Sequence, residues 1–214
     1  MRPLRRKTWR MSQQTPAAIL LSPGLKQAER LSTRGCRGDD RGDAQGPAVI
    51  APFRTGIGHD VHRLFPGREL VLGGVIVSTE VGFDTHSDGD VLSHALIDAL
   101  AGAIADGDLG THYPEDDPDA EDARSLGFVE EFGGYVRRAG YEIANVDAFI
   151  VLGTVPLRPH IGTMRSNVAA ALGMDLADVS IKARSNDGLG PEGEGSACAA
   201  WVSVLVYPVD TGRA

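Results

Sequence analysis

The chain has 214 residues, of which 42% are hydrophobic and 23% are charged, and its formal net charge is −8. This composition is typical of a soluble globular protein with one domain or two, and it excludes collagen-like and disordered chains. The longest nearly continuous apolar stretch, 197–209, is shorter than the roughly 18–20 residues that cross a bilayer, and two cysteines are too few for a disulfide framework.

The first 50 residues differ in charge from the rest of the chain. They carry a net charge of +6, whereas the remainder carries −14. They contain no acidic residue before Glu29, and their apolar run at 16–21 is too short for a secretory signal. We predict that residues 1–53 form a disordered basic leader and linker. An organellar transit peptide, or an arm that binds nucleic acid or a partner, is the alternative interpretation.

The folded domain is predicted to span residues 54–209, followed by a tail at 210–214. Apolar residues alternate over 55–63, as in a half-buried strand. Two short apolar runs then flank a glycine pair, which is the pattern of a β-hairpin. The runs are Leu70–Leu72 and Val75–Val77, and the pair is Gly73-Gly74.

The middle and end of the domain show alternating helix and strand patterns. Apolar residues recur with helical spacing from Val91 to Ile104, with Ser87 as the expected N-cap, and a loop rich in Gly, Pro and acidic residues follows at 107–120. Further elements are predicted as helices at 122–139 and 159–172, and as strands at 146–155, 179–183 and 197–207. The order β-β-α-α-β-α-β-β predicts an α+β fold, a single domain with a mixed β-sheet and helices packed on one face.

Histidines are concentrated near the start of the domain. Four of the six fall between His59 and His94. In a strand, residues two apart face the same side, so Asp60 and His62 can both point at one metal ion while Val61 faces the core. Ordinary strand polarity is the alternative interpretation, because Asp-x-His is a common sequence.

His94 strengthens the metal interpretation. It lies in the predicted helix at 91–104, with Asp90 and Asp98 one turn to either side on the same face. A zinc-bound imidazole usually donates its other N–H to a carboxylate, and either aspartate could accept it. Two imidazoles and one carboxylate would leave the fourth position of a tetrahedral zinc open, as in catalytic sites. A helix with a polar stripe is the alternative.

Two segments are candidates for binding phosphate. His86 and Ser87 stand at the turn before the helix, where free amides, a hydroxyl and an imidazole attract anions, although helix capping would also explain Ser87. Lys182, the only lysine of the predicted domain, and Arg184 stand at the end of a predicted strand before a glycine-containing loop. They could bind a second phosphate, and a solvated strand end is the alternative.

Several short motifs follow one another in a fixed order. They are Gly-His-Asp-Val-His at 58–62, Leu-Gly-Gly at 72–74, His-Ser-Asp-Gly-Asp-Val at 86–91, His-Ala-Leu at 94–96, Gly-Asp-Leu-Gly at 107–110, Asn-Val-Asp at 145–147, Pro-His-Ile at 159–161 and Gly-Glu-Gly at 193–195. In this order they resemble the motifs of the 2-C-methyl-D-erythritol 2,4-cyclodiphosphate synthase family of the non-mevalonate isoprenoid pathway.

The resemblance implies a phosphorus–oxygen lyase that cyclises 4-diphosphocytidyl-2-C-methyl-D-erythritol 2-phosphate and releases CMP. It implies a homotrimer with active sites between subunits, which could hold an isoprenoid-like ligand in a central cavity. It also implies two kinds of metal ion. Zinc, or another divalent transition metal, would be held by Asp60, His62 and His94, and Asp187 would lie near magnesium or manganese.

The resemblance also assigns roles in substrate binding. His86 and Ser87 match phosphate contacts, and Asp108 to Gly110 match the methylerythritol contact. His86 and Ser185 match the pair that stabilises the transition state. The full set of expected substrate-binding residues is Asp60, His62, His86, Ser87, Asp108, Gly110, Arg158, Lys182, Arg184, Ser185 and Asp187.

The chain departs from the family pattern in its nucleotide-binding loops. The segment 154–156 is Thr-Val-Pro where the family commonly has Ala-Pro-Lys, and 184–187 is Arg-Ser-Asn-Asp in place of Thr-Thr-Thr-Glu. The spacer before Gly-Glu-Gly is two residues shorter and lacks an arginine. Arg158 and Arg184 could restore the lost positive charge. A family member with altered nucleotide selectivity is therefore one alternative, and a non-catalytic trimeric protein that binds metal or isoprenoid is another.

The expected partners and location follow from the charge and the leader. A domain with a charge of −14 would repel nucleic-acid backbones, and no membrane partner is expected. We expect a cytoplasmic protein, or one of an organelle such as a plastid if residues 1–50 are a transit peptide.

Overall fold

The computed structural model describes residues 53–85, 88–113 and 124–209. The leader at 1–52, the tail at 210–214, His86 and Ser87 lie outside these residues. Within them, no helix is long and apolar enough to cross a membrane.

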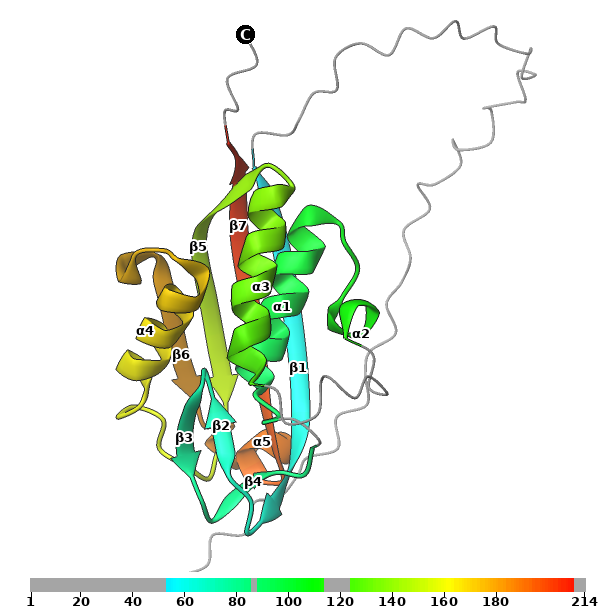
Figure 1. The fold of residues 1–214 in the computed structure, drawn as a ribbon. Coiled ribbons are helices and arrows are strands. Elements are labelled where there is room, and N and C mark those ends of the chain that lie inside the picture. Colours follow the sequence, from blue (N-terminus) through cyan, green and yellow to red (C-terminus); the bar gives the residue numbers. More distant parts are fainter. Residues whose placement is uncertain (1–52, 86–87, 114–123, 210–214) are drawn as a thin grey trace, which may run out of the picture. The chain divides into compact units, whose positions relative to one another are not determined.

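A five-stranded sheet forms the framework of the domain, in the order β4-β1-β7-β5-β6 (Figure 1). Its strands are β1 (Arg54–Pro66), β4 (Val81–Phe83), β5 (Tyr141–Val151), β6 (Val179–Arg184) and β7 (Ala197–Pro208). Only β5 and β6 pair in parallel, so the sheet is mixed as predicted. Two further strands, β2 (Leu70–Leu72) and β3 (Val75–Ser78), form the predicted hairpin around the glycine pair.

Three long helices lie on one face of this sheet, as predicted (Figure 1). They are α1 (Val91–Ile104), α3 (Ser125–Arg138) and α4 (Ile161–Leu172). Short helical segments occur at α2 (Leu109–His112), α5 (Gly190–Glu194) and the 3-10 turns Leu176–Asp178 and Asn186–Gly188.

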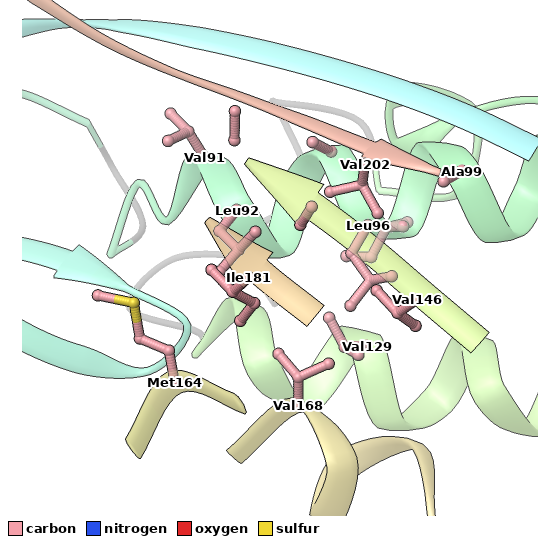
Figure 2. Close-up of a cluster of buried hydrophobic side chains, with 14 of the residues drawn as sticks. Val91, Leu92, Leu96, Ala99, Val129, Val146, Met164, Val168, Ile181 and Val202 are labelled. Carbon is pink, nitrogen blue, oxygen red and sulfur yellow. The ribbon is translucent and has the colours of Figure 1, made fainter. Parts of the chain in front are cut away.

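The hydrophobic core lies between the helices and the sheet (Figure 2). Leu92 and Leu96 of α1, Val129 of α3, Val146 of β5 and Val202 of β7 are all buried there. Burying one such side chain contributes about 1.5–3 kcal/mol to folding. This core therefore fixes α1, and with it His94, over the sheet.

Two glycines of β1 allow α1 to approach the strand very closely. A Cβ atom on Gly58 would lie 1.9 Å from the carbonyl oxygen of Ala95, and one on Gly56 would lie 1.8 Å from that of Ala99. No side chain fits at either position, so helix backbone packs on strand backbone. Gly58 stands two residues before Asp60, and Ala95 stands directly after His94. This backbone contact therefore sets the distance between the side chains of Asp60 and His94.

Several predicted details need correction. The N-cap of α1 is Asp90 rather than Ser87. Strand β5 covers 141–151 instead of 146–155, and α3 begins at Ser125. Val61 does not face the core: it is 45% exposed on the open face of the sheet, while Asp60 and His62 lie on the helix-covered side.

Candidate metal centre and substrate loops

Three side chains from two elements converge on one point. Asp60 and His62 extend from β1, and His94 extends from the first turns of α1. Oδ2 of Asp60 lies 3.0 Å from Nδ1 of His94 and 3.2 Å from Nε2 of His62, and one ligand atom from each residue lies within 4.8 Å of the others. Two imidazole nitrogens and a carboxylate oxygen suit zinc and other divalent transition metals. The structure thus brings together the predicted trio as a candidate metal site.

The ring nitrogen of each histidine that points away from the candidate metal also has a hydrogen-bond partner. Nδ1 of His62 lies 3.0 Å from the carbonyl oxygen of Gly89, which can only accept, so this nitrogen carries a proton and Nε2 is left to bind a metal. Nε2 of His94 lies 3.0 Å from Oγ of Ser125. The same hydroxyl lies 2.5 Å from Oδ1 of Asp88. Each ring is therefore fixed in orientation from the side opposite the candidate metal.

The carboxylates expected to support His94 have other roles. Asp90 is completely buried and caps α1, accepting hydrogen bonds from the amides of Leu92 and Ser93 at 3.1 and 3.2 Å. It also accepts from the amide of Gly74 at 2.9 Å, which ties the hairpin turn to the helix. Asp90 therefore occupies the amides of Leu92 and Ser93 at the start of α1.

Asp98 holds the neighbouring short helix. Its Oδ1 accepts a hydrogen bond from the amide of Leu109 at 2.8 Å, which anchors the start of α2. The ring of His94 instead meets Asp60 on one side and Ser125 on the other. The prediction that Asp90 or Asp98 accepts the imidazole proton is thus wrong, and Ser125 is the partner at that nitrogen.

Burial and charge shift the pKa values of the three candidate ligands in different directions. Burial lowers the pKa of His62. Burial also acts to lower the pKa of His94, but the hydrogen bond to Asp60 and the negative charge of Asp60 outweigh this effect, so the pKa of His94 is raised. Burial likewise works to raise the pKa of Asp60, yet the two histidines lower it below its ordinary value. The site thus favours an Asp60 carboxylate paired with a protonated His94, and a metal cation would displace the proton from Nδ1.

The predicted methylerythritol contact lies at the start of α2. Asp108 is exposed and caps this helix, with Oδ1 accepting from the amide and hydroxyl of Thr111 at 2.8 and 2.6 Å. Gly110 is also exposed. Two predicted phosphate contacts, His86 and Ser87, stand outside the described residues.

The remaining predicted substrate-binding residues lie toward the β6 edge of the sheet. Lys182 is on β6, where its Nζ forms an ion pair with Oδ1 of Asp147 at 2.5 Å. Arg158 follows β5, and Arg184 ends β6, both exposed. Across the sheet, Val61 pairs with Ala199, Ala199 with Val151, and Val151 with Arg184. Arg184 therefore lies three strand spacings, or about 14 Å, from β1. One copy of the chain therefore holds the predicted site residues in two separate groups.

The loop that follows β6 has an unusual backbone. Asn186 and Asp187 have φ values of 53° and 51°, in the left-handed region, and Ser185 caps this turn. Such conformations in residues other than glycine cost energy and concentrate at functional sites. The exposed Asp187 carboxylate is therefore presented from a constrained turn.

The two loops that differ from the family pattern pack against each other. The amide of Gly153 donates to the carbonyl oxygen of Glu192 at 2.9 Å. A Cβ atom on Gly153 would lie 2.3 Å from the carbonyl oxygen of Gly193. The segment after β5 and helix α5 are thus fitted to each other at backbone distance.

Comparison with known proteins agrees with this arrangement. Residues 53–207 match the model of the YgbB family. The chain is 44% identical over 156 residues to 2-C-methyl-D-erythritol 2,4-cyclodiphosphate synthase of Trichlorobacter lovleyi, covering 73% of this chain and 99% of that protein. It is 46% identical over 160 residues to the enzyme of the same name from Moorella thermoacetica, covering 75% and 98%.

Solved structures also resemble the domain. The bifunctional IspDF of Campylobacter jejuni matches with a TM-score of 0.72 and 35% identity, over 75% of this chain and 44% of that longer one. The IspF of Plasmodium falciparum in complex with CDP matches with a TM-score of 0.66 and 27% identity, over 74% and 97%. The chain therefore belongs to the YgbB family of 2-C-methyl-D-erythritol 2,4-cyclodiphosphate synthases, and it is an enzyme of the lyase class.

Proposed function

We propose that this chain converts 4-diphosphocytidyl-2-C-methyl-D-erythritol 2-phosphate to 2-C-methyl-D-erythritol 2,4-cyclodiphosphate with release of CMP, in a zinc-dependent reaction. The observation that supports this most strongly is the convergence of Oδ2 of Asp60, Nε2 of His62 and Nδ1 of His94. The names of the relatives, and the CDP bound in the Plasmodium falciparum structure, support the substrate class.

The reaction is an internal phosphoryl transfer. An oxygen of the 2-phosphate attacks the phosphorus of the diphosphate that is distal to cytidine, and the bond from that phosphorus to the bridging oxygen breaks, so CMP leaves with the electron pair. Such transfers need positioning and charge neutralisation more than covalent participation. When bound, the divalent cations would supply that neutralisation and polarise the phosphate oxygens.

The chain's own residues would divide this work between them. Asp60, His62 and His94 would hold the zinc ion, and Asp187 the magnesium or manganese ion. Ser87 would bind phosphate, and His86 and Ser185 would stabilise charge in the transition state. Asp108 and Gly110, at the start of α2, would contact the methylerythritol part.

We further propose that the active enzyme is a homotrimer in which the open face of the sheet turns inward. Ile57 is 76% exposed there, and Val61 is exposed on the same face. The rings of His59 and Trp201 lie 4.5 Å apart, and Phe149 stacks on Trp201 at 4.9 Å. An exposed apolar face of this kind is typical of an interaction surface. A cavity enclosed by three such faces could also hold an isoprenoid-like ligand.

A trimer would also explain why the candidate residues form two groups. The metal ligands of one subunit and the loops around Arg158 and Arg184 of the next would together complete each active site. Because the loops carry the differences from the family pattern, the second candidate function is the same cyclisation with altered nucleotide selectivity. We place the protein in the cytoplasm on the strength of its bacterial relatives.

The test is an incubation of the full chain, loaded with zinc and magnesium, with the cytidyl substrate. We expect equal amounts of CMP and cyclic diphosphate, measured by chromatography and phosphorus NMR. The uridyl and adenyl analogues serve as controls for selectivity. A zinc-loaded trimer that releases no nucleotide from any of the three would defeat the proposal, and faster turnover of an analogue would favour the second candidate.

A further inference from the structure

A partly buried chain of hydrogen bonds leads away from the candidate metal site. It runs from His94 on α1 to Ser125, the first residue of α3, and on to Asp88 in the loop before α1. The distances are 3.0 Å from Nε2 of His94 to Oγ of Ser125, and 2.5 Å from that oxygen to Oδ1 of Asp88. Ser125 is one of three polar residues that are fully buried among those described, with 0% exposure.

The direction of these hydrogen bonds follows from their chemistry. An ionised carboxylate can only accept, so the hydroxyl of Ser125 donates to Asp88. The lone pairs of Oγ are then left to accept the Nε2 proton of His94. With that proton held at Nε2, Nδ1 is the nitrogen that can bind a cation. Asp88 thus favours, through the serine, the form of His94 whose Nδ1 is free of a proton and can bind the metal.

Asp88 also fixes where Ser125 stands. Its second oxygen, Oδ2, accepts a hydrogen bond from the backbone amide of Ser125 at 3.1 Å. One carboxylate therefore binds both the backbone and the side chain of the residue that begins α3. Asp88 thus holds Ser125 at two points, the backbone amide through Oδ2 and the hydroxyl through Oδ1, which fixes the position of the hydroxyl.

We propose that Ser125 is a positioning residue for the metal, which acts through His94 and is itself oriented by Asp88. This inference rests on the metal site of the proposed function and extends it to residues that lie behind the ligands. The alternative is that Ser125 only satisfies hydrogen bonds in the core. Ser93 offers the comparison, because it is also completely buried and its hydroxyl also donates to an aspartate, Asp90, at 2.9 Å.

The experiment compares Ser125→Ala with Ser93→Ala in the full chain after removal of metal by a chelator. Zinc affinity is measured by competition with a chromophoric chelator, and the ligand geometry by the visible absorption of bound Co²⁺. Loss of such an outer partner typically weakens metal binding by about 10- to 100-fold. We expect this loss and a changed Co²⁺ spectrum for Ser125→Ala, and wild-type values for Ser93→Ala.

A second variant guards against a folding defect. Asp88→Asn keeps the hydroxyl of Ser125 but weakens its acceptor, so we expect reduced zinc affinity in the same direction. Wild-type affinity and spectrum in both Ser125→Ala and Asp88→Asn, or an equal loss in Ser93→Ala, would overturn the inference and leave the cyclase proposal standing. Failure of the wild-type chain to bind zinc would instead overturn the metal site and this inference with it.

Discussion

The two groups of candidate site residues differ in how the fold holds them. Asp60, His62 and His94 extend from β1 and α1, are partly buried, and contact one another at 3.0 and 3.2 Å. Arg184, at the end of β6, and Asp187, in the loop that follows, are both exposed and lie at the β6 edge of the sheet. A single chain thus preorganises the group that would hold the metal, which we call the metal half of the site. The group at the end of β6, which we call the loop half, lies apart from it. We expect loss of a metal ligand in the first group to abolish function, and loss of a single positive charge in the second group to weaken substrate binding.

Removal of a metal ligand should have the largest effect. In His94→Ala, we expect zinc binding to be lost and CMP release to fall by about a thousandfold or more. The reason is that metal stabilisation of transition-state charge is worth several kcal/mol, and each 1.36 kcal/mol is a factor of ten. Steady-state CMP release and metal analysis check this, with Ser93→Ala as the neighbouring control. Activity within tenfold of wild type would show that His94 is not a ligand.

The close packing of α1 on β1 should be the next most sensitive feature. A methyl group in Gly58→Ala would lie 1.9 Å from the carbonyl oxygen of Ala95 and force the helix away from Asp60. We expect a loss of about 3 kcal/mol in the free energy of unfolding, at the upper end for overpacking, together with weaker zinc binding. Urea unfolding and zinc titration measure the two effects.

Gly102→Ala is the matched control for that substitution. Gly102 lies on the exposed side of the same helix, with nothing within 4 Å of an added Cβ atom. Alanine should therefore stabilise the chain by about 0.5–1 kcal/mol through helix propensity and leave zinc binding unchanged. Equal behaviour of the two variants would contradict the close-packing account.

Loss of charge from the loop half should have a smaller effect. Arg184→Ala should raise the KM for the cytidyl substrate by about tenfold, as for a lost hydrogen bond to a charged group, with zinc affinity unchanged. Lys182→Ala should raise it less, because Lys182 already pairs with Asp147. Steady-state kinetics distinguish the two, and a loss of zinc in either variant would show that the halves are not separate.

The smallest expected effect is on the pH dependence of stability in chelator-treated protein. The lowered pKa of Asp60 contributes stability that is present above its ordinary value of 3.8 and lost as the pH falls through the lowered value. The raised pKa of His94 contributes stability that is present below 6.5 and lost as the pH rises through the raised value.

Both contributions are therefore fully present between about pH 3.8 and 6.5. The difference in the free energy of unfolding between wild type and His94→Gln should be largest in this window, as measured by urea titration at several pH values. A difference that grows steadily above pH 7 would contradict the assigned pair.

Much of the fold could be predicted because local patterns and packing agree. The helical spacing from Val91 to Ile104 and the glycine pair at 73–74 both matched the elements that form. The orientation of β1 could not be read in this way. Its larger apolar residues, such as Ile57 and Val61, lie on the open face, because the side that meets α1 has room only for glycine at positions 56 and 58.

The candidate site was predicted in part for similar reasons. The spacing of Asp60 and His62, together with His94, predicted a trio that the fold brings together. Ser125 was missed because it lies 31 positions from His94, and only the placement of α3 beside α1 makes them neighbours. The aspartates beside His94 on its helix were the local candidates, but capping α1 and anchoring α2 engage them instead. The homotrimer and the nucleotide contacts stay predictions.

The most direct test of the central claim is zinc content and CMP release measured on one preparation of the full chain. Chelator-treated protein would be titrated with zinc at constant magnesium, and both quantities followed at each step. We predict that CMP release rises in proportion to bound zinc and levels off at about one zinc ion per chain, as three ligands forming a single site require. Full zinc occupancy without CMP release, or undiminished release from zinc-free protein, would contradict the account.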